Sequence, residues 1–468
     1  MKKILCILLA AALLVFCLSA CATNGTTNDF GAPPGDFPGE PPEGGRPGDP
    51  PDGAPPGGGP VGSSADVTYT AATELNSADT QEGQSYASTA SDESALLLRG
   101  ADVTITDATV TQTGDSDGGD SCNFYGLNAA VLVMDGANAT ITGGTVTSDA
   151  NGANGVFCYG GNGGRNGAEG DGTTLTIRDT KITTTGDGSG GVMTTGGGVT
   201  YAYDLDVTTS GRSSAAIRTD RGGGTVSVTG GSYVSNGLGS PAIYSTAEIA
   251  VADATLVSNL SEGVCIEGKN SITLTNCDLT ANNTQRNGHA TFLDSIMIYQ
   301  SMSGDADSGT SAFTMTGGSL TSKSGHVFHV TNTNAVITLS GVKIVNEDAE
   351  NVLLSVCADG WSGAGNVAAL KAIAQELEGT ILVGSDSSLT LELTGGSNFT
   401  GAVDGSITNA SGETVSAEIG EVAVTLDADS TWTLTGDCYI TSFTGSASNV
   451  VSNGYTLYVN GTPLDGVR

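Results

Sequence analysis

The chain has 468 residues, including 70 glycines, and its formal net charge is −34. The chain has 16 Lys and Arg residues and 50 Asp and Glu residues. This balance excludes nucleic acid as a partner, and it excludes direct binding of the protein surface to an anionic membrane. The glycines follow no every-third pattern, which excludes collagen, and the apolar residues fall in short alternating runs that favour a β-rich repeat over a disordered chain.

The first residues predict export. Lys2 and Lys3 precede an apolar run from Ile4 to Phe16, which is too short to span a membrane and suits a secretory signal. Leu18-Ser19-Ala20-Cys21 follows. This arrangement resembles the lipobox of bacterial lipoproteins, and the resemblance implies that residues 1–20 are a signal peptide and that Cys21 is lipidated. The alternative is an ordinary cleaved signal followed by an incidental cysteine.

The next segment predicts a spacer. Eleven of the 13 prolines lie between Gly31 and Gly62, mixed with glycine and acidic residues, and such a segment cannot bury a core. At about 3.1 Å per residue in polyproline II, it would reach roughly 100 Å. We expect residues 21–63 to be a lipid anchor and tether, and residues 64–468 to be one domain. The protein would then be a monomer exposed at the cell surface, touching the membrane only through its lipid.

One short pattern recurs after the tether. An apolar-x-apolar run is followed, five residues after its anchor, by a second apolar residue. Between the two anchors lie tight-bend pairs such as Gly-Gly, Asp-Ala or Asn-Cys, and the shortest step from one unit to the next is about 23 residues. The anchor pairs are Ile105 and Val110, Ile141 and Val146, Ile177 and Ile182, Ala202 and Val207, Val228 and Tyr233, Val251 and Leu256, Leu274 and Leu279, Met315 and Leu320, and Leu339 and Ile344.

A third short strand follows each pair, as in Gly191-Val192-Met193-Thr194 and Ala216-Ile217-Arg218-Thr219. Three strands per unit with loops of variable length predict a right-handed parallel β-helix of about a dozen coils, because one coil cannot bury its apolar face alone. We expect residues 65–100 to cap one end and the strands around Trp432 and Tyr455–Val459 to close the other. A helical pattern over 367–374 predicts one short surface helix.

Such a chain resembles the pectate-lyase-like superfamily and the carbohydrate-binding β-helix lipoproteins of Gram-positive bacteria. The resemblance covers residues 65–468 as a pattern without a signature motif. It implies the β-helix and a polysaccharide or other glycan as partner, but one solenoid hosts lyases, hydrolases, adhesins and passive stalks.

The third strands predict a contact face. If Val192, Ile217, Ile243, Val264, Ile296 and Val327 point inward, alternation sends a row of large side chains outward. Aromatic rings beside charged groups suit a glycan. The outward row would comprise Leu132 and Met134, Phe157 and Tyr159, Met193 and Thr195, Arg218 and Asp220, Tyr244 and Thr246, Cys265 and Glu267, Met297 and Tyr299, and Phe328 and Val330. The predicted ligand-binding residues are Phe157, Tyr159, Arg218, Asp220, Tyr244, Glu267, Lys269 and Tyr299.

Long loops lead into or leave the third strands and would wall a groove over this row. They are expected at Thr113–Asn123, Gly160–Gly172, Asn282–Asp294, Ser301–Thr310 and Asp359–Gly379. The alternative is that these loops cover the row and form a second apolar layer.

Catalysis is a narrower possibility. β-helix lyases use a basic residue with carboxylate-held calcium, and Arg218, Asp220 and Glu267 are the candidate residues of those types. The Arg-x-Pro-x-x-Arg pattern of pectate lyases is absent, as are the clustered aspartates and Gly-His-Gly of polygalacturonases. The arginines at 212, 218 and 221 also suit simple salt bridges.

Signals for metals and disulfides are faint. Asp115, Asp117 and Asp120, and Asp305 and Asp307, could offer oxygen ligands to Ca²⁺, but without EF-hand spacing. His326 and His329, three apart on a strand, should face opposite ways and make a poor zinc pair. Cys122 and Cys158 could pair, although lone thiols packed between coils are favoured for all six cysteines after the anchor.

Three functions therefore remain open. The first is a surface adhesin or carbohydrate-binding protein. The second is a polysaccharide lyase or glycoside hydrolase on the same scaffold, and the third is a passive structural envelope protein. Exposure of the outward row separates the first from the third.

Overall fold

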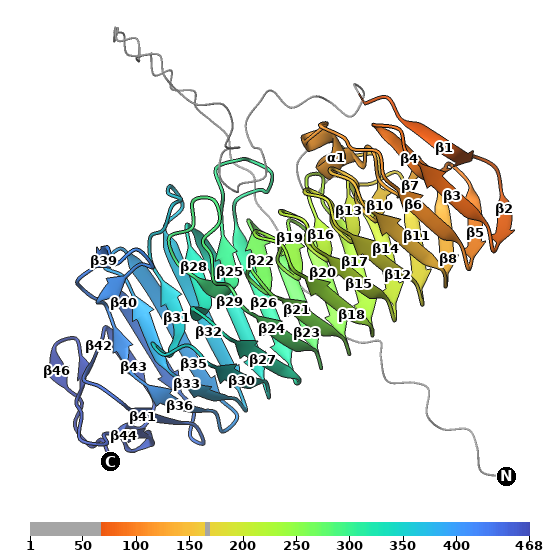
Figure 1. Ribbon diagram of the computed structural model, residues 1–468. Helices are drawn as coiled ribbons and strands as arrows, with labels where there is room; N and C mark the ends of the chain where they lie inside the picture. The colour runs from red at the N-terminus through yellow and green to blue at the C-terminus, as the bar shows by residue number, and fades with distance from the viewer. Residues whose placement is uncertain (1–66, 164–168) are drawn as a thin grey trace, which may run out of the picture. The chain divides into compact units, whose positions relative to one another are not determined.

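The computed structural model describes residues 67–163 and 169–468, so the predictions for the signal peptide, Cys21 and the tether lie outside the described residues. The described chain is a right-handed parallel β-helix, which confirms the predicted fold class. Its coils follow one another in chain order from β1 to the C-terminal strands (Figure 1). Among the described residues, no helix has the length and apolar character needed to cross a membrane.

Three long parallel sheets run along the solenoid. Sheet A has 13 strands and contains the predicted third strand of each coil. Its members are β1 (Thr70–Leu75), β4 (Glu93–Arg99), β7 (Val131–Met134), β10 (Val156–Tyr159), β13 (Val192–Thr195), β16 (Ile217–Thr219), β19 (Ile243–Ser245), β22 (Val264–Glu267), β25 (Asp294–Tyr299), β28 (His326–Thr331), β31 (Val352–Val356), β34 (Thr380–Val383) and β37 (Val403–Asp404).

Sheet B has 14 strands and carries the first anchor of each pair. They are β2 (Asp79–Glu82), β5 (Asp102–Thr106), β8 (Asn138–Thr142), β11 (Thr174–Arg178), β14 (Gly198–Tyr203), β17 (Gly224–Thr229), β20 (Glu248–Ala252), β23 (Ser271–Thr275), β26 (Thr310–Thr316), β29 (Thr333–Ser340), β32 (Asn366–Ile373), β35 (Ser387–Thr394), β40 (Glu421–Leu426) and β43 (Ser442–Thr444).

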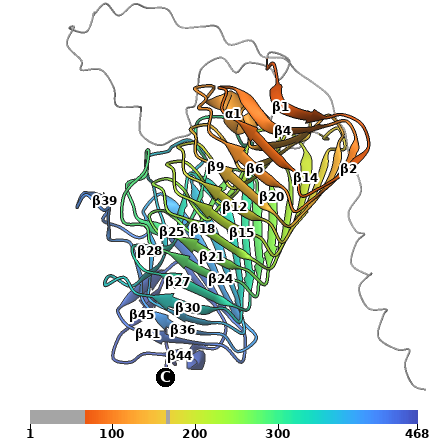
Figure 2. The same ribbon diagram turned by 45° about the vertical axis from the view of Figure 1, so that its right-hand side comes forward.

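Sheet C has ten strands, carries the second anchor, and is seen with its strands side by side in Figure 2. They are β3 (Ser85–Ser88), β6 (Thr109–Gln112), β9 (Thr145–Ser148), β12 (Lys181–Thr184), β15 (Asp206–Thr209), β18 (Ser232–Ser235), β21 (Thr255–Ser258), β24 (Asp278–Ala281), β27 (Ser319–Ser322) and β30 (Lys343–Asn346). A separate four-stranded sheet follows, made of β33 (Glu376–Glu378), β36 (Asn398–Gly401), β41 (Thr431–Leu434) and β44 (Val450–Val451).

The predicted anchors are aligned in the sheets. In sheet B, Ile141 pairs with Ile105 on one side and Ile177 on the other, and the alignment continues through to Leu339. The second anchors align in the same way in sheet C, from Val110 to Ile344. Because these side chains stack on one another inside the solenoid, they form its continuous apolar core.

The bend between sheets B and C repeats one backbone conformation. Its first residue has a positive φ, which Gly adopts freely and Asp or Asn adopt more readily than other residues. The residues at this position are Gly83, Asp107, Gly143, Asp179, Asp204, Gly230, Asp253, Asn276, Gly317 and Gly341. The Gly-Gly, Asp-Ala and Asn-Cys pairs in the sequence thus mark one recurrent corner, as predicted.

The two ends differ from each other. Residues 65–100 were expected to be a cap, but their described part forms the first coil, β1 to β3, and then β4. At the C-terminal end, strands lie at the residues where the sequence predicted them. Trp432 is buried in β41, and β42 (Cys438–Ile440), β45 (Leu457–Val459) and β46 (Thr462–Pro463) form a small sheet in which β45 and β46 pair antiparallel.

The predicted helix over 367–374 is wrong. These residues lie in β32, which pairs along its whole length with β29 and β35. Ala368, Leu370 and Ala372 point into the core while Val367 and Ile373 are exposed, so alternation in a growing sheet outweighs the helix propensity of the Ala-Leu-Lys sequence. The described helix is α1 (Asp120–Tyr125), which begins inside the loop predicted at Thr113–Asn123, and a 3₁₀ turn covers Ala447–Asn449.

Candidate functional site

The outward row of sheet A is covered. Leu132, Phe157 and Met193 have no exposed surface, and Arg218, Tyr244, Cys265 and Met297 each keep 9% or less. The sequence left two alternatives for this row, a wall-lined groove or a second apolar layer. Over most of its length the row is the second layer.

The covering at the first coils comes from α1. Phe124 and Tyr125 pack on Leu132, Phe157 and Tyr159 in one buried cluster, and Oγ1 of Thr195 donates to the carbonyl of Phe124 at 2.6 Å. Phe157 and Tyr159 are 0% and 2% exposed. Their prediction as ligand-binding residues is therefore wrong, because the Thr113–Asn123 loop that was expected to flank them continues as a helix on top of them.

The register of the row also differs at β28. Ile296 pairs with Phe328, and Met297 pairs with His329. Phe328 and Val330 therefore belong to the core, and His329 takes the outward position that we predicted for Phe328. Both β25 and β28 are buried at every position, so the alternation that would have fixed the register is absent from their sequences.

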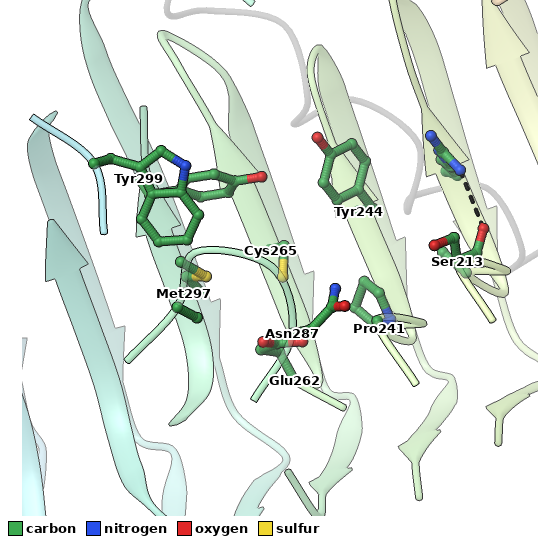
Figure 3. Close-up of a pocket in the computed structure, with 13 residues that line it drawn as sticks. Ser213, Pro241, Tyr244, Glu262, Cys265, Asn287, Met297 and Tyr299 are labelled. Atoms are coloured by element: carbon green, nitrogen blue, oxygen red, sulfur yellow. Dashed lines mark hydrogen bonds between the residues drawn. The ribbon is translucent and has the colours of Figure 1, made fainter. Parts of the chain in front are cut away.

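A pocket remains open above β19, β22 and β25 (Figure 3). Its cavity of about 70 Å³ is room for several water molecules. Tyr244 and Tyr299 stand on either side of Cys265, with Glu262 and Asn287 below it in the view. The residues that line it are Ser213, Ala215, Arg218, Gly239, Pro241, Tyr244, Glu262, Cys265, Asn287, Ala290, Met297, Tyr299 and Trp361.

Trp361 forms one side of this pocket. It belongs to the loop after β31 and lies partly buried against the cluster of Tyr244, Met297 and Tyr299. Its ring centroid is 4.9 Å from that of Tyr299, with 51° between the planes. Trp361 and Tyr299 thus form an aromatic corner on which an apolar ring face can rest.

Glu267 fixes the two tyrosines. Its Oε2 accepts hydrogen bonds from the hydroxyls of Tyr244 at 2.5 Å and Tyr299 at 3.2 Å, and its Oε1 accepts from Ser301 and, at 3.4 Å, from Ser303. Burial raises the pKa of Glu267, and these hydrogen bonds oppose the rise. Burial, with the Glu267 carboxylate second, raises the pKa of both tyrosines well above the usual range, so their hydroxyls remain donors.

Two buried ion pairs have their arginines in β16 or just after it, and the first of these, Arg218, lines the pocket. Nε of Arg218 donates to Oδ2 of Asp220 at 3.0 Å, and its guanidinium carbon lies 5.3 Å from the Tyr244 ring centroid. Nε of Arg221 donates to Oδ1 of Asp305 at 3.1 Å, which ties the loop after β25 to the end of β16. Burial raises the pKa of Asp220 to about 6 despite Arg218.

Glu262 is the acidic group that lines the pocket. It is 6% exposed, and burial raises its pKa. Burial, followed by the nearby Glu262 and Asp359 carboxyl groups, raises the pKa of Asp294 well above its usual range, and neither Asp294 carboxyl oxygen has a hydrogen-bond partner among the described residues. Oε2 of Glu262 accepts a hydrogen bond from Oγ of Ser261. The Glu262 carboxyl group lines the pocket, whereas Asp220 and Glu267 are not among the lining residues.

The other predicted residues are dispersed. Lys269 lies outside the pocket, where its Nζ pairs with Asp307 at 2.9 Å. Asp305 binds Arg221, and Oδ1 of Asp115 accepts from the backbone N–H of Asn151 at 2.8 Å. Within residues 67–163 and 169–468, no three His, Cys, Asp or Glu side chains are grouped to hold a metal ion, so the Asp115, Asp117, Asp120, Asp305 and Asp307 candidates do not form one site.

The prediction that His326 and His329 face opposite ways is wrong, because both side chains contact Ser355. Nδ1 of His326 and Nδ1 of His329 both lie within hydrogen-bond distance of Oγ of Ser355, at 2.7 and 2.8 Å. Nε2 of His329 is 3.3 Å from Oδ2 of Asp359. Ser355 and His329 have no exposed surface, so this Ser-His-Asp chain is closed to a substrate and acts as packing.

The six described cysteines are all free and buried. The suggested pairing of Cys122 with Cys158 is wrong. Cys158 belongs to the core of the solenoid, while Cys122 belongs to α1 and its Sγ lies 3.2 Å from Oγ of Ser116.

Sequence reasoning found Arg218, Tyr244 and Tyr299, which line the pocket, and Glu267, which positions the tyrosines. It missed Glu262, Asn287 and above all Trp361. One signal for Trp361 was present, since it is one of two tryptophans in the chain and lies in a long loop next to the third strand. Comparisons with protein-family models, curated proteins and solved structures found no match to this chain.

Proposed function

We propose that this protein is a cell-surface carbohydrate-binding protein and that its pocket above β19, β22 and β25 receives the edge of one sugar ring. The observation that carries the proposal is the aromatic corner of Tyr299 and Trp361 beside Glu262, Asn287 and Arg218. Sugar rings stack on aromatic faces, and fixed polar groups beside those faces take their hydroxyls. The cavity of about 70 Å³ admits part of a ring, so the rest of the saccharide lies across Trp361.

The test is a binding titration of the full chain with a panel of neutral and acidic oligosaccharides. Trp361→Ala should weaken binding about tenfold or more, which corresponds to about 1.4 kcal/mol. The matched control is Tyr201→Ala, a tyrosine on sheet B that is 40% exposed and lies outside the pocket. Binding that survives Trp361→Ala and Tyr299→Ala together, or no binding to any oligosaccharide, would overturn the proposal.

We further propose that Cys21 is lipidated and that residues 31–62 hold the β-helix away from the membrane. The support is the order of charge, apolar run and cysteine at the N-terminus, followed by the proline-rich segment. Cells fed a fatty acid that carries a clickable tag should label the protein, and Cys21→Ala should abolish the label and release the protein. A labelled Cys21→Ala protein would contradict this part.

A structural envelope role is the second candidate, and the buried outward row of sheet A favours it. A lyase or hydrolase has less support, because the proposed acids Asp220 and Glu267 are engaged by Arg218 and by two tyrosines. If the oligosaccharide panel fails, the structural role is the one that remains.

A further inference from the structure

A second hollow, of about 560 Å³, lies beside the pocket. Arg212 and Arg286 both line it, together with Thr284 and Gln285, and none of the described residues in its wall is acidic. The chain as a whole has 50 acidic and 16 basic residues. Two arginines and no acidic residue among the described residues of this wall are therefore a local departure from the acidic composition of the chain.

The hollow and the pocket are direct neighbours. At two places in the chain, one residue lines the hollow and the next residue lines the pocket. Arg212 and Leu238 line the hollow, and Ser213 and Gly239 line the pocket. In the Asn282–Asp294 loop Ala290 lines both. Because consecutive Cα atoms are about 3.8 Å apart, one ligand can reach both cavities.

The charge of Arg286 is available. Arg286 is exposed and takes part in none of the ion pairs or side-chain hydrogen bonds among the described residues. Five other cations, by contrast, pair with acids, namely Arg99, Lys181, Arg218, Arg221 and Lys269. The backbone of Arg212 is fixed, since its N–H donates to Oδ1 of Asp187 at 2.8 Å and its carbonyl accepts from Oγ of Ser214 at 3.0 Å.

We propose that Arg212 and Arg286 bind the oxyanion of an acidic saccharide, one that carries a carboxylate or a sulfate, while a neighbouring ring occupies the aromatic pocket. This rests on the proposed function and adds the class of sugar. A guanidinium offers a planar fork of N–H donors that matches a carboxylate or sulfate, and it stays charged at all relevant pH values. The two arginines also offset the repulsion that a surface of −34 exerts on an acidic polymer.

The test compares three trimers in titrations of the full chain at low salt: a galacturonic acid trimer, a galactose trimer, and the same galactose trimer carrying sulfate. At least one acidic trimer should bind about fivefold or more tightly than the neutral one, and whichever does identifies the oxyanion. Arg286→Gln and Arg212→Gln should each remove most of this preference and leave the neutral trimer within about twofold. Arg286→Lys should retain part of it, because the charge stays and the fork is lost.

The matched control is Lys371→Gln, a cation on sheet B that lines neither cavity. Thermal unfolding of each variant checks that it is folded, which we expect because Arg286 is exposed. If the galactose trimer binds through Trp361 but the arginine variants leave the acidic preference unchanged, or if there is no preference, this inference falls and the proposed function stands. If no trimer binds, both fall together.

Discussion

The hydroxyls of Tyr244 and Tyr299 converge on the same atom, Oε2 of Glu267, although the two tyrosines lie on β19 and β25 and the glutamate on β22 between them. Three successive strands of sheet A thereby share one buried carboxylate. The positions of the two tyrosines that line the pocket are thus fixed by the main chain and by one buried carboxyl group.

Glu267→Gln should lower the free energy of unfolding by about 1–3 kcal/mol, because a buried carboxyl group that accepts from Tyr and Ser hydroxyls is replaced by an amide that presents a donor to them. It should also weaken saccharide binding, since the tyrosine rings lose their common support. Urea denaturation and the titration above measure the two effects. Glu248→Gln, at an exposed glutamate of β20, serves as the control, and equal stability of the two variants would contradict the account.

Phe328→Ala tests the register of β28. Phe328 is fully buried in the core, so its truncation should cost about 3–5 kcal/mol. Thr338→Ala, at an outward position of β29, should cost less than about 1 kcal/mol in the same denaturation experiment. A small loss for Phe328→Ala would contradict its position in the core.

Gly144→Ala tests the corner between sheets B and C. A Cβ at Gly144 would lie 2.1 Å from the carbonyl oxygen of Ala108, and φ there is +74°. Gly341 also has a positive φ, +61°, but has open space around it. Both substitutions carry the backbone penalty, about 1–2 kcal/mol, so the thermal midpoint of Gly144→Ala should fall well below that of Gly341→Ala. Similar midpoints would mean that the coils can move apart at no cost.

His326→Gln tests acid stability. Burial, reinforced by His329 and opposed by Asp348 and Asp359, lowers the pKa of His326 to about 3. The unfolded chain takes up a proton near pH 6.5 that the folded chain refuses, so this residue makes stability fall as the pH drops from about 6.5 towards 3. Urea denaturation at pH 7 and at pH 4 measures the free energy of unfolding. Between these two pH values it should fall by up to about 3 kcal/mol less in the variant than in the unchanged protein.

Asp220 changes the free energy of unfolding with pH in the direction opposite to His326. Its folded pKa of about 6 lies above its unfolded value, so it adds stability at low pH that is lost as the pH rises through 6. Only the difference between His326→Gln and the unchanged protein isolates the histidine. Parallel profiles for the two proteins would contradict the assignment.

The thiols should be inert until the protein unfolds. Burial raises the pKa of Cys122 and Cys438 to about 11 and that of Cys158 to about 12, and only a thiolate reacts rapidly. Alkylation of the native full chain, read residue by residue by mass spectrometry, should leave all six described cysteines unmodified, whereas the chain in urea should react at each. Fast native labelling of any one would show that its coil opens locally.

The sequence allowed the solenoid to be predicted because each coil repeats a strong local signal. Ile105, Ile141 and Ile177 stand at the same step of an alternating run followed by a bend, and their alignment required no knowledge of distant contacts. Prediction failed where that signal is weak or ambiguous. β28 is buried on both faces, and the Ala-Leu-Lys sequence of β32 suits a helix until neighbouring strands are in place.

The site was predictable only in part, for a related reason. Tyr244 and Tyr299 lie on strands, whose positions follow from the repeat. What covers or accompanies them comes from loops, and a loop contact such as that between Phe124 and Thr195 joins residues 71 apart in the chain. Nothing in the local sequence of Phe157 distinguishes a ring that α1 covers from a ring beside an open pocket. Trp361 lies in the loop after β31, two coils beyond the strand of Tyr299, so their contact is not visible in the local sequence either.

The position of the two tyrosines on β19 and β25 also sets a fixed length. Neighbouring strands are about 4.8 Å apart, so the two strands are separated by roughly 10 Å, a distance maintained by peptide hydrogen bonds and not by side-chain packing. The loops can change in length and composition while the distance between β19 and β25 stays the same. Affinity for a sugar is therefore free to evolve through the loops, but the separation of the two strands that carry the tyrosines belongs to the scaffold.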